Sequence, residues 1–383
     1  MRRARPGMSM LCGALVAMVL PATAAGEGAE PAATGTPLSA DVAYYPTTVR
    51  LAHAGEENGA VLTATVSFGS GGGSVPIYES TDDGATFDEV GRITDDGFGE
   101  GLCCGSLLEL PGAVGDLPEG TLLWTGSAGA DQETDRRMRL PVFESRDRGR
   151  SWTQLSTCAT GTGTGGMWEP ELAVDSAGTL GCYYADENQP GHSQVLHRTT
   201  STDGVNWSAP EPVVQVPEGD LRPGMAVVRP LPDGRYYLSY EICGGGDPYH
   251  CAAYFRLSDD GSDWGDPAAH GTLLATEDGR FFAHAPKITV TPDGKVVTVG
   301  QELKHADGTV AEGNGATLFV TDRPGSSTPT AIPAPVEVPA ARDDPCPNYS
   351  SSLLPVGEDR ILEIATDYDD GGACKAYFAT GDL

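Results

Sequence analysis

Ser80-Thr81-Asp82-Asp83-Gly84-Ala85-Thr86-Phe87 is the stretch that decides the fold, because its pattern returns three more times. Each copy follows a strand-like apolar run and carries a serine, an aspartate two residues later, a glycine and an aromatic residue. These residues suit a hairpin, because Ser and Asp oxygens accept hydrogen bonds from nearby backbone N–H groups and Gly supplies positive φ. The four copies, called Asp boxes below, are centred on Asp82, Asp147, Asp203 and Asp260, at steps of 65, 56 and 57 residues.

A second turn signal has a similar period and precedes a β-rich run each time. Self-similarity at a fixed period of this size indicates a repeat architecture. Four short strands per repeat, with a turn after the first and an Asp box after the third, describe a blade of a β-propeller. We therefore predict an all-β, six-bladed β-propeller with four-stranded antiparallel blades. The six turns lie at residues 57–59, 118–120, 176–178, 232–234, 292–294 and 357–359.

The N-terminus has the pattern of a targeting segment. Arg2, Arg3 and Arg5 precede an apolar stretch at residues 10–20, and small residues follow at 21–25. We expect residues 1–25 to be a secretory signal peptide, 26–38 a flexible lead-in and 39–383 the propeller, with a strand near residues 40–44 closing the ring. The protein is thus expected to be secreted and extracellular, and no later stretch is long and apolar enough to span a bilayer.

Cysteine usage agrees with export. Without Cys12 of the signal segment, eight of the nine cysteines remain, and disulfides are the default interpretation for an exported chain. Cys243 and Cys251 bracket a glycine-rich loop and are the first pair that we expect. The pairing of the others stays open at this stage, including that of the adjacent Cys103 and Cys104.

The formal net charge is −30. Such a charge argues against binding to nucleic acid or to an anionic membrane, and it suits a neutral or cationic substrate. No metal-ligand spacing of Cys and His and no phosphate-cradling Gly loop is found, so neither a metal nor a cofactor is expected. We expect a monomer whose partner is an oligosaccharide or polysaccharide.

Topology predicts which residues meet at one face. In an antiparallel blade, the start of the first strand and the end of the second lie on the same face, and the Asp boxes lie on the opposite one. The Asp boxes are therefore expected to be structural. The residues predicted on the other face, where propellers bind ligands, are Tyr45, Cys103, Cys104, Glu169, Asp186, Arg222, Glu241, His284, Glu302, Tyr349 and Asp367.

Two glutamates stand out in this set. Glu169 begins the third blade in Trp168-Glu169-Pro170, and Glu241 ends the second strand of the fourth blade. Hydrolysis of a glycosidic bond needs such a pair, with one carboxyl held protonated and the other ionised. Trp168 is placed to dehydrate Glu169 and to raise its pKa.

The motifs Trp168-Glu169-Pro170, Arg222-Pro223-Gly224-Met225, Tyr240-Glu241 and Tyr349-Ser350-Ser351-Ser352-Leu353 resemble those of glycoside hydrolase family 93. This family comprises exo-arabinanases with a six-bladed, sialidase-like propeller. The resemblance implies that Glu241 is the nucleophile and Glu169 the acid/base, although the pair is better supported than the two roles. It also implies that Tyr349 supports the charge of the nucleophile and that Arg222 shapes the sugar site.

The implied function is retaining hydrolysis of arabinofuranosidic linkages in a neutral plant-type polysaccharide. A retaining scheme predicts carboxyl groups about 5–5.5 Å apart, and about 6.5–9.5 Å would indicate inversion. Further candidates for substrate contact are Trp168, Asp186, His284 and Tyr45. Cys103-Cys104, the loop from Cys243 to Cys251 and His284-Ala285-Pro286 depart from the family pattern, which leaves the sugar open.

Two alternatives stay open. A sialidase shares the Asp boxes and the fold, but it needs an arginine cluster for the substrate carboxylate. Only Arg222 lies clearly at a blade start, with Arg280 and Arg342 as further candidates. The other alternative is a non-catalytic carbohydrate-binding propeller, which a large separation of Glu169 and Glu241 would favour.

Overall fold

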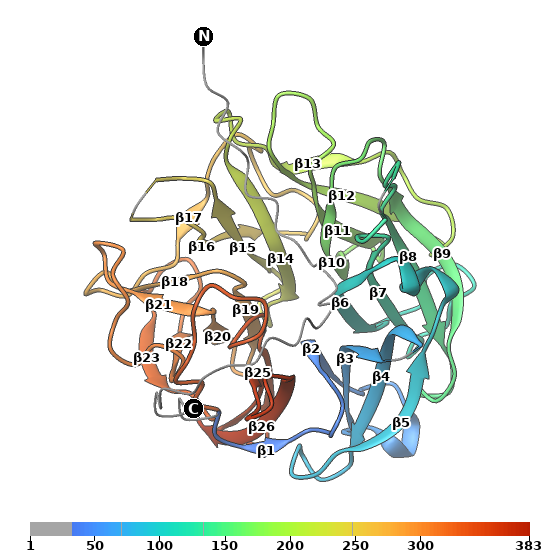
Figure 1. The fold of residues 1–383 in the computed structure, drawn as a ribbon, viewed down its shortest axis with the longest axis horizontal. Coiled ribbons are helices and arrows are strands. Elements are labelled where there is room, and N and C mark those ends of the chain that lie inside the picture. The colour runs from blue at the N-terminus through green and yellow to red at the C-terminus, as the bar shows by residue number, and fades with distance from the viewer. Residues whose placement is uncertain (1–32, 70, 133, 247) are drawn as a thin grey trace, which may run out of the picture.

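The computed structural model describes residues 33–383 except 70, 133 and 247. The predicted signal peptide and residues 26–32 of the predicted lead-in lie outside this range. Six antiparallel sheets surround a central axis (Figure 1), so the prediction of an all-β, six-bladed propeller is confirmed. None of the helices among the described residues is long and apolar enough to span a bilayer.

Each of the first three blades is one four-stranded sheet, and its strands run in chain order from the axis outwards. Blade 1 contains β2 (Tyr44–Arg50), β3 (Val61–Gly69), β4 (Gly72–Ser80) and β5 (Asp88–Ile93). Blade 2 contains β6 (Leu102–Glu109), β7 (Leu122–Ala128), β8 (Arg139–Ser145) and β9 (Thr153–Thr160). Blade 3 contains β10 (Met167–Val174), β11 (Leu180–Asp186), β12 (Val195–Ser201) and β13 (Glu211–Val214).

The other three blades follow the same plan with two additions. Blade 4 contains β14 (Arg222–Pro230), β15 (Tyr236–Cys243), β16 (Ala252–Ser258) and β17 (Thr272–Leu273), and its sheet is extended by β18 (Phe281–Ala283) and β21 (Glu302–Lys304). Blade 5 contains β19 (Lys287–Val290), β20 (Val296–Val299), β22 (Thr317–Thr321) and β23 (Thr330–Pro333). Blade 6 contains β24 (Ser352–Val356), β25 (Arg360–Tyr368), β26 (Cys374–Asp382) and β1 (Thr36–Pro37).

The core lies between neighbouring blades. Strand β7 is buried at every position, because blades 1 and 3 cover its two faces. In the largest of these layers, Leu62 and Ile77 of blade 1 pack with Leu122 and Trp124 of blade 2. Burial of apolar area at about 25 cal/mol per Å² makes each such layer a main source of stability.

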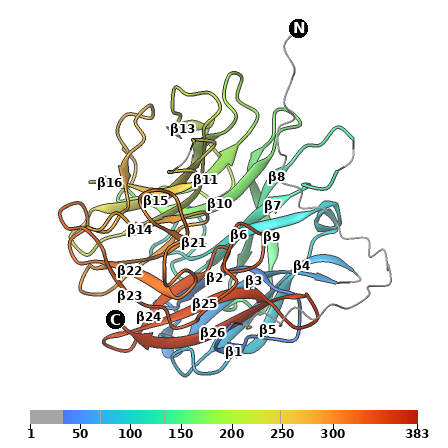
Figure 2. The same cartoon turned by 60° about the vertical axis from the view of Figure 1, so that its left-hand side comes forward.

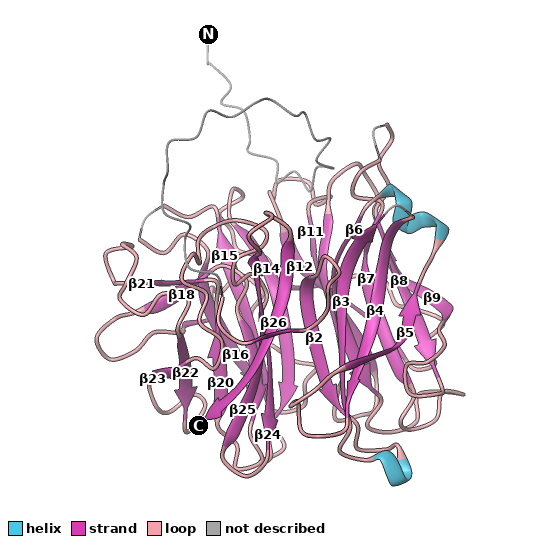
Figure 3. Ribbon diagram, turned by 60° about the horizontal axis from the view of Figure 1, so that its bottom comes forward, coloured by secondary structure: helices cyan, strands magenta, loops and turns pink. Residues whose placement is uncertain are grey.

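The four Asp boxes have one common geometry. The serine is the last residue of the third strand in each blade, and its Oγ accepts a hydrogen bond from the glycine N–H at 2.8–2.9 Å. The aromatic residue then packs onto the neighbouring blade, as Trp207 does against the layer between blades 2 and 3. The strands run side by side between the two faces of a disc (Figure 3). The Asp boxes lie at the face where the first strand of each blade ends. The opposite face, where first strands begin, is called the mouth face below.

The ring closes through the N-terminal segment. Thr36 and Pro37 of β1 pair with Phe378 and Tyr377 of β26, so β1 is the outermost strand of blade 6 (Figure 2). Two further hydrogen bonds join this segment to β26: Leu38 N–H donates to Ala376 O, and Ala43 N–H donates to Cys374 O. The expected closing strand near residues 40–44 thus begins earlier, at the end of the predicted lead-in, because Thr36 and Pro37 pair with the outer edge of β26.

Four disulfides cross-link the described residues. The expected pair Cys243–Cys251 is confirmed, and the adjacent Cys103 and Cys104 bond to each other. The remaining pairs, which the sequence left open, are Cys158–Cys182 and Cys346–Cys374. Cys12 lies outside the described residues.

A buried carboxyl in blade 6 leads to a stability prediction. Glu363 is 1% exposed, accepts a hydrogen bond from Val336 N–H, and burial raises its pKa to about 8 from 4.5. Because the pKa of Glu363 is higher in the folded than in the unfolded protein, protonated Glu363 stabilises the fold. This stabilisation is complete below the unfolded-state pKa and is lost as the pH rises towards 8. We expect Glu363→Gln to remove this loss, about 1.4 kcal/mol of unfolding free energy per pH unit between pH 5 and 8.

Urea unfolding of both proteins across this pH range measures the slope. The control is Glu358→Gln at an exposed turn, which should leave the wild-type slope unchanged. Parallel pH dependences for wild type and Glu363→Gln would contradict the prediction.

Candidate active site

A residue in the left-handed backbone region lies at or near the start of each inner strand. These six residues are called the mouth ring. Such φ values are strained for residues other than glycine, and in four blades the pairing of the first two strands shifts register at this point. A bulge turns a side chain that would otherwise follow the strand, and in blades 1 to 4 it lies at the position of the left-handed residue. The mouth ring consists of Tyr45 (φ 49°), Cys104 (39°), Glu169 (51°), Met225 (56°), Ala285 (47°) and Ser350 (61°).

Hydrogen bonds between blades hold these residues at one level. In three cases, the side chain two residues after the mouth-ring residue of one blade accepts a hydrogen bond from the following blade. The donor is the backbone N–H three residues after that blade's mouth-ring residue. Thr47 accepts from Leu107 at 3.3 Å, Ser106 from Leu172 at 3.1 Å, and Glu171 from Val228 at 3.4 Å. Because the offset is the same each time, the inner strands of blades 1 to 4 are in equal register. The side chains two positions after the mouth ring form a second ring beneath it: Thr47, Ser106, Glu171, Val227, Lys287 and Ser352.

The two glutamates are each anchored to the following blade. Glu169 Oε2 accepts from Met225 N–H at 3.3 Å, and Glu241 Oε2 accepts from Ala285 N–H at 2.6 Å. Gly224 lies between them, because it pairs with Glu241 across β14 and β15, and a Cβ on it would lie 3.2 Å from Glu169 Oε2. The structure therefore brings Glu169 and Glu241 together at the axis of the mouth face.

Both carboxyls are shifted towards the protonated form. Burial raises the pKa of Glu169 to about 7, against the Met225 hydrogen bond and the positive charges of Arg222 and Lys287. Burial raises the pKa of Glu241 to about 8, and repulsion from Glu169 adds to it. Because each negative charge disfavours the other, the pair gives up its two protons in separate steps.

Two cations lie near the pair in different settings. Arg222 donates to Glu187 at 2.5 Å, to Gln194 at 2.6 Å and to Ser193 Oγ at 3.0 Å, which fixes its guanidinium beside blade 3. Lys287 lies in the second ring, where burial lowers its pKa and Glu171 opposes that shift. It also interacts with Glu169 and Glu241, so the second ring places a basic group beneath the pair, beside the acidic Glu171 of the same ring.

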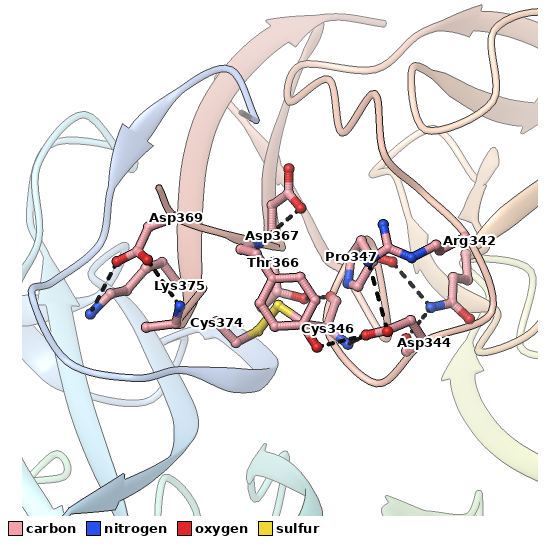
Figure 4. The surroundings of a disulfide bond; sticks show 12 residues. Arg342, Asp344, Cys346, Pro347, Thr366, Asp367, Asp369, Cys374 and Lys375 are labelled. Carbon is pink, nitrogen blue, oxygen red and sulfur yellow. Dashed lines mark hydrogen bonds and ion pairs between the residues drawn. A yellow bond between two sulfur atoms is a disulfide. The ribbon is translucent and has the colours of Figure 1, made fainter. Parts of the chain in front are cut away.

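Tyr349 and Tyr45 meet at the axis. Tyr349 is 6% exposed and packs with Met225 and Ala285, and its ring centroid lies 5.5 Å from that of Tyr45. The disulfide Cys346–Cys374 ties the loop before Tyr349 to β26 (Figure 4), and Tyr349 N–H donates to Cys346 O at 3.2 Å. The loop that carries Tyr349 is therefore cross-linked to the blade behind it.

The other predicted site residues differ in their placement. His284 is 5% exposed and has a ring nitrogen within 4.8 Å of a Glu241 carboxylate oxygen. Asp186 accepts hydrogen bonds from Asn188 and Gln189 and contacts His197, all within blade 3. Trp168 packs against the layer between blades 2 and 3, with the Arg136 guanidinium 6.0 Å from its ring centroid. Glu302 pairs with Lys304 at 3.2 Å, and Asp367 accepts from Tyr368 N–H at 2.8 Å.

One group of metal-ligating side chains is found among the described residues. It consists of Glu241, Cys243, Cys251 and His284. Both sulfurs belong to the Cys243–Cys251 disulfide, so neither offers a thiolate to an ion. Of this group, only the Glu241 carboxylate and the His284 imidazole remain as possible ligands, and both lie beside the disulfide.

Comparison with solved structures gives long matches. An α-L-arabinanase of Penicillium chrysogenum, solved with arabinobiose, is 25% identical, with a TM-score of 0.75 over 92% of this chain and 99% of that one. A family 93 α-L-arabinofuranosidase of Fusarium graminearum, also solved with arabinobiose, is 24% identical, with a TM-score of 0.73 over 92% and 98%. The chain thus resembles the family 93 glycoside hydrolases over nearly its whole length.

A more distant match is the microbial sialidase Hz136, which is 14% identical with a TM-score of 0.57 and indicates a shared fold. No family model and no curated protein matches the sequence.

The structure places the sequence features that depart from the family 93 pattern. Cys104 occupies the mouth-ring position of blade 2, joined to Cys103, and the disulfide Cys243–Cys251 lies beside Glu241 and His284. Sequence reasoning named Gly224, Met225 and Ala285 only within motifs, and it missed their roles as spacer and backbone donors. It missed the buried Lys287 altogether. One signal was present in the sequence: proline follows the mouth-ring residue in three blades, in Tyr45-Pro46, Glu169-Pro170 and Ala285-Pro286.

Proposed function

We propose that the protein is a secreted, monomeric glycoside hydrolase that cleaves arabinofuranosidic linkages of a linear, neutral arabinan from one end. The observation that carries the proposal is the pair Glu169 and Glu241, two carboxyls with raised pKa values anchored on adjacent blades at one level of the axis. The arabinobiose-bound neighbours support the sugar class.

In the proposed mechanism, Glu241 attacks the anomeric carbon while the C–O bond to the leaving group breaks. Glu169 transfers its proton to the departing oxygen, which leaves as an alcohol. Glu169 then takes a proton from water, whose oxygen displaces Glu241 from the anomeric carbon. The net result is retention, and NMR of the first-formed product tests it, since an inverted product would exclude a covalent intermediate on Glu241.

This scheme fixes where the single proton must reside. The reactive form needs the proton on Glu169 and the charge on Glu241, which is the reverse of the order of the two pKa values in the free protein. The Ala285 hydrogen bond of 2.6 Å favours the ionised form of Glu241, and Tyr349 is proposed to add to this once substrate displaces water. Trp168, Arg222, Asp186, His284 and Tyr45 remain the proposed sugar contacts.

A hydrolysis screen tests the function. Purified protein is incubated with linear arabinan, aryl arabinofuranosides and a sialoside, alongside the variants Glu169→Gln and Glu241→Gln. Release of arabinose or arabinobiose by wild type alone is the expected result. Cleavage of the sialoside would change the substrate class, and absence of hydrolysis on all substrates would leave a carbohydrate-binding propeller.

Activity should depend on pH as a narrow bell. One carboxyl must be protonated and the other ionised, and the raised pKa values of about 7 and about 8 bound the range in which the pair holds one proton. We therefore expect kcat/KM on arabinan to be highest between pH 7 and 8 and to fall about tenfold per unit on either side. A plateau extending to pH 5 would contradict the raised pKa values.

Lys287 offers a matched test of that profile. The charged groups that face it are Glu171, Arg229, Glu169 and Glu241. Replacing Lys287 with Met removes a positive charge near both carboxyls, so their pKa values rise and both limbs of the bell move to higher pH. Lys287→Arg keeps the charge and should retain the wild-type limbs; a lower rate at unchanged limbs in Lys287→Met would indicate a packing role only.

A further inference from the structure

A file of aromatic side chains leads from the catalytic pair to the rim of blade 1. The ring centroids of Tyr349 and Tyr45 lie 5.5 Å apart, those of Tyr45 and Tyr44 6.4 Å, and those of Tyr44 and Phe68 6.0 Å. Tyr44 and Tyr45 lie at the start of β2, and Phe68 lies near the end of the neighbouring β3. All four are thus on the mouth face.

Exposure increases along this file. Tyr349 is 6% exposed, Tyr45 and Tyr44 are half-buried, and Phe68 is 41% exposed, one of few large apolar side chains so open among the described residues. Tyr44 and Tyr45 pack against the core layer between blades 1 and 2, whereas Phe68 belongs to no core layer. Packing of the fold therefore accounts for the inner members and leaves the outer one unexplained.

Phe68 also lines a cavity of about 560 Å³ at the rim. Its other walls include the polar side chains of Asp41, Ser74, Arg92 and Asp95. Arg92 is held by ion pairs with Asp41 and Glu89 and by a hydrogen bond to Ser74 at 3.0 Å, so its donors are preorganised. An apolar ring beside fixed donors and acceptors is the usual composition of a site for an uncharged polar ligand.

We propose that Tyr45, Tyr44 and Phe68 form successive binding positions for a linear oligosaccharide, running from the catalytic pair to the cavity beside Phe68. This inference rests on the proposed function, because Tyr349 joins the file to Glu241 only if the pair acts on a sugar. The occupant is the part of a neutral arabinan chain beyond the scissile bond.

The chemistry of a sugar suits this path. One face of each ring presents C–H groups, which pack on an aromatic side chain, while the hydroxyls at the edge are left for polar partners. An aromatic ring loses little conformational entropy on binding, so several weak contacts in a row suit a long, flexible substrate.

The test compares chain lengths in a protein that binds without cleaving. Titration calorimetry with the Glu241→Gln variant measures the dissociation constants of arabinobiose and of a longer linear arabino-oligosaccharide, with and without Phe68→Ala. We expect Phe68→Ala to weaken the longer ligand about three- to tenfold, as for loss of one aromatic contact, and to affect arabinobiose much less. Val205→Ala removes a comparably exposed apolar side chain at the Asp-box face and is the matched control.

Equal effects on both ligands, or no effect on the longer one, would overturn the proposal. Tyr44→Ala on the same background is the second variant, and its loss should also grow with chain length. Binding is measured without turnover, so its result is separable from the activity screen. If the variants weaken binding of the longer ligand selectively but the wild type hydrolyses no substrate, the proposed binding path is supported and the proposed hydrolase activity is contradicted.

Discussion

Replacing Glu241 with Gln should abolish hydrolysis of arabinan, lowering kcat by roughly 10⁴-fold or more, above the range of about 10²–10⁴ for a general acid or base alone. An amide has the same shape as the carboxylate but does not form the covalent intermediate. The amide oxygen still accepts from Ala285 N–H, so the site should keep its geometry. Initial rates on linear arabinan measure the loss.

The matched control for this change is Glu363→Gln. It alters a second fully buried glutamate in the same way, but in blade 6 and away from the mouth ring, and its activity should stay within about twofold of wild type. An active Glu241→Gln variant, or an equal loss in Glu363→Gln, would contradict the assignment of the nucleophile.

Added azide identifies the role of the residue that is removed. In Glu241→Ala the anion fits the vacated space and attacks the anomeric carbon once, so the glycosyl azide should have the inverted configuration. A product of retained configuration would instead show that Glu241 is the acid/base and that Glu169 is the nucleophile. Product configuration by NMR decides between these outcomes.

Replacing Glu169 with Gln should lower kcat/KM on arabinan by about 10²–10⁴-fold, since the departing sugar alkoxide is no longer protonated. The loss should be much smaller for an aryl arabinofuranoside with an acidic phenol, because that leaving group departs as an anion. For this substrate the covalent intermediate should accumulate, and azide should accelerate turnover and give a product of retained configuration.

A uniform loss across leaving groups would contradict the acid/base role of Glu169. Glu187→Gln is a useful comparison, because Glu187 also raises the pKa of Glu169 and holds Arg222 at 2.5 Å. Its effect should show no dependence on the leaving group, since it acts on binding and positioning.

Some features could be predicted because the interactions that define them are local. Every Asp box closes with hydrogen bonds between residues two to four apart, such as Gly84 N–H to Ser80 Oγ at 2.8 Å. The repeat of these turns sets the number of blades, and strand order then places Glu169 and Glu241 on one face. The pair was accessible from sequence because register along a strand is a matter of counting.

Other features depend on contacts between blades and had no such local signal. Met225 and Ala285 serve through backbone N–H groups, so their side chains give no hint of the role. Lys287 looks like an ordinary strand residue until the second ring places it near Glu171, Glu169 and Glu241. The closing strand at Thr36–Pro37 is chosen by the free edge of β26, at the far end of the chain.

The sequence by itself determined the blade, the number of blades and the face that carries the two carboxyls, because hairpin chemistry and strand alternation act over a few residues. Only the tertiary structure decided how close those groups come, which backbone donors hold them and how far their pKa values rise. Those properties arise from burial and from charges on neighbouring blades, which come together only when the ring closes.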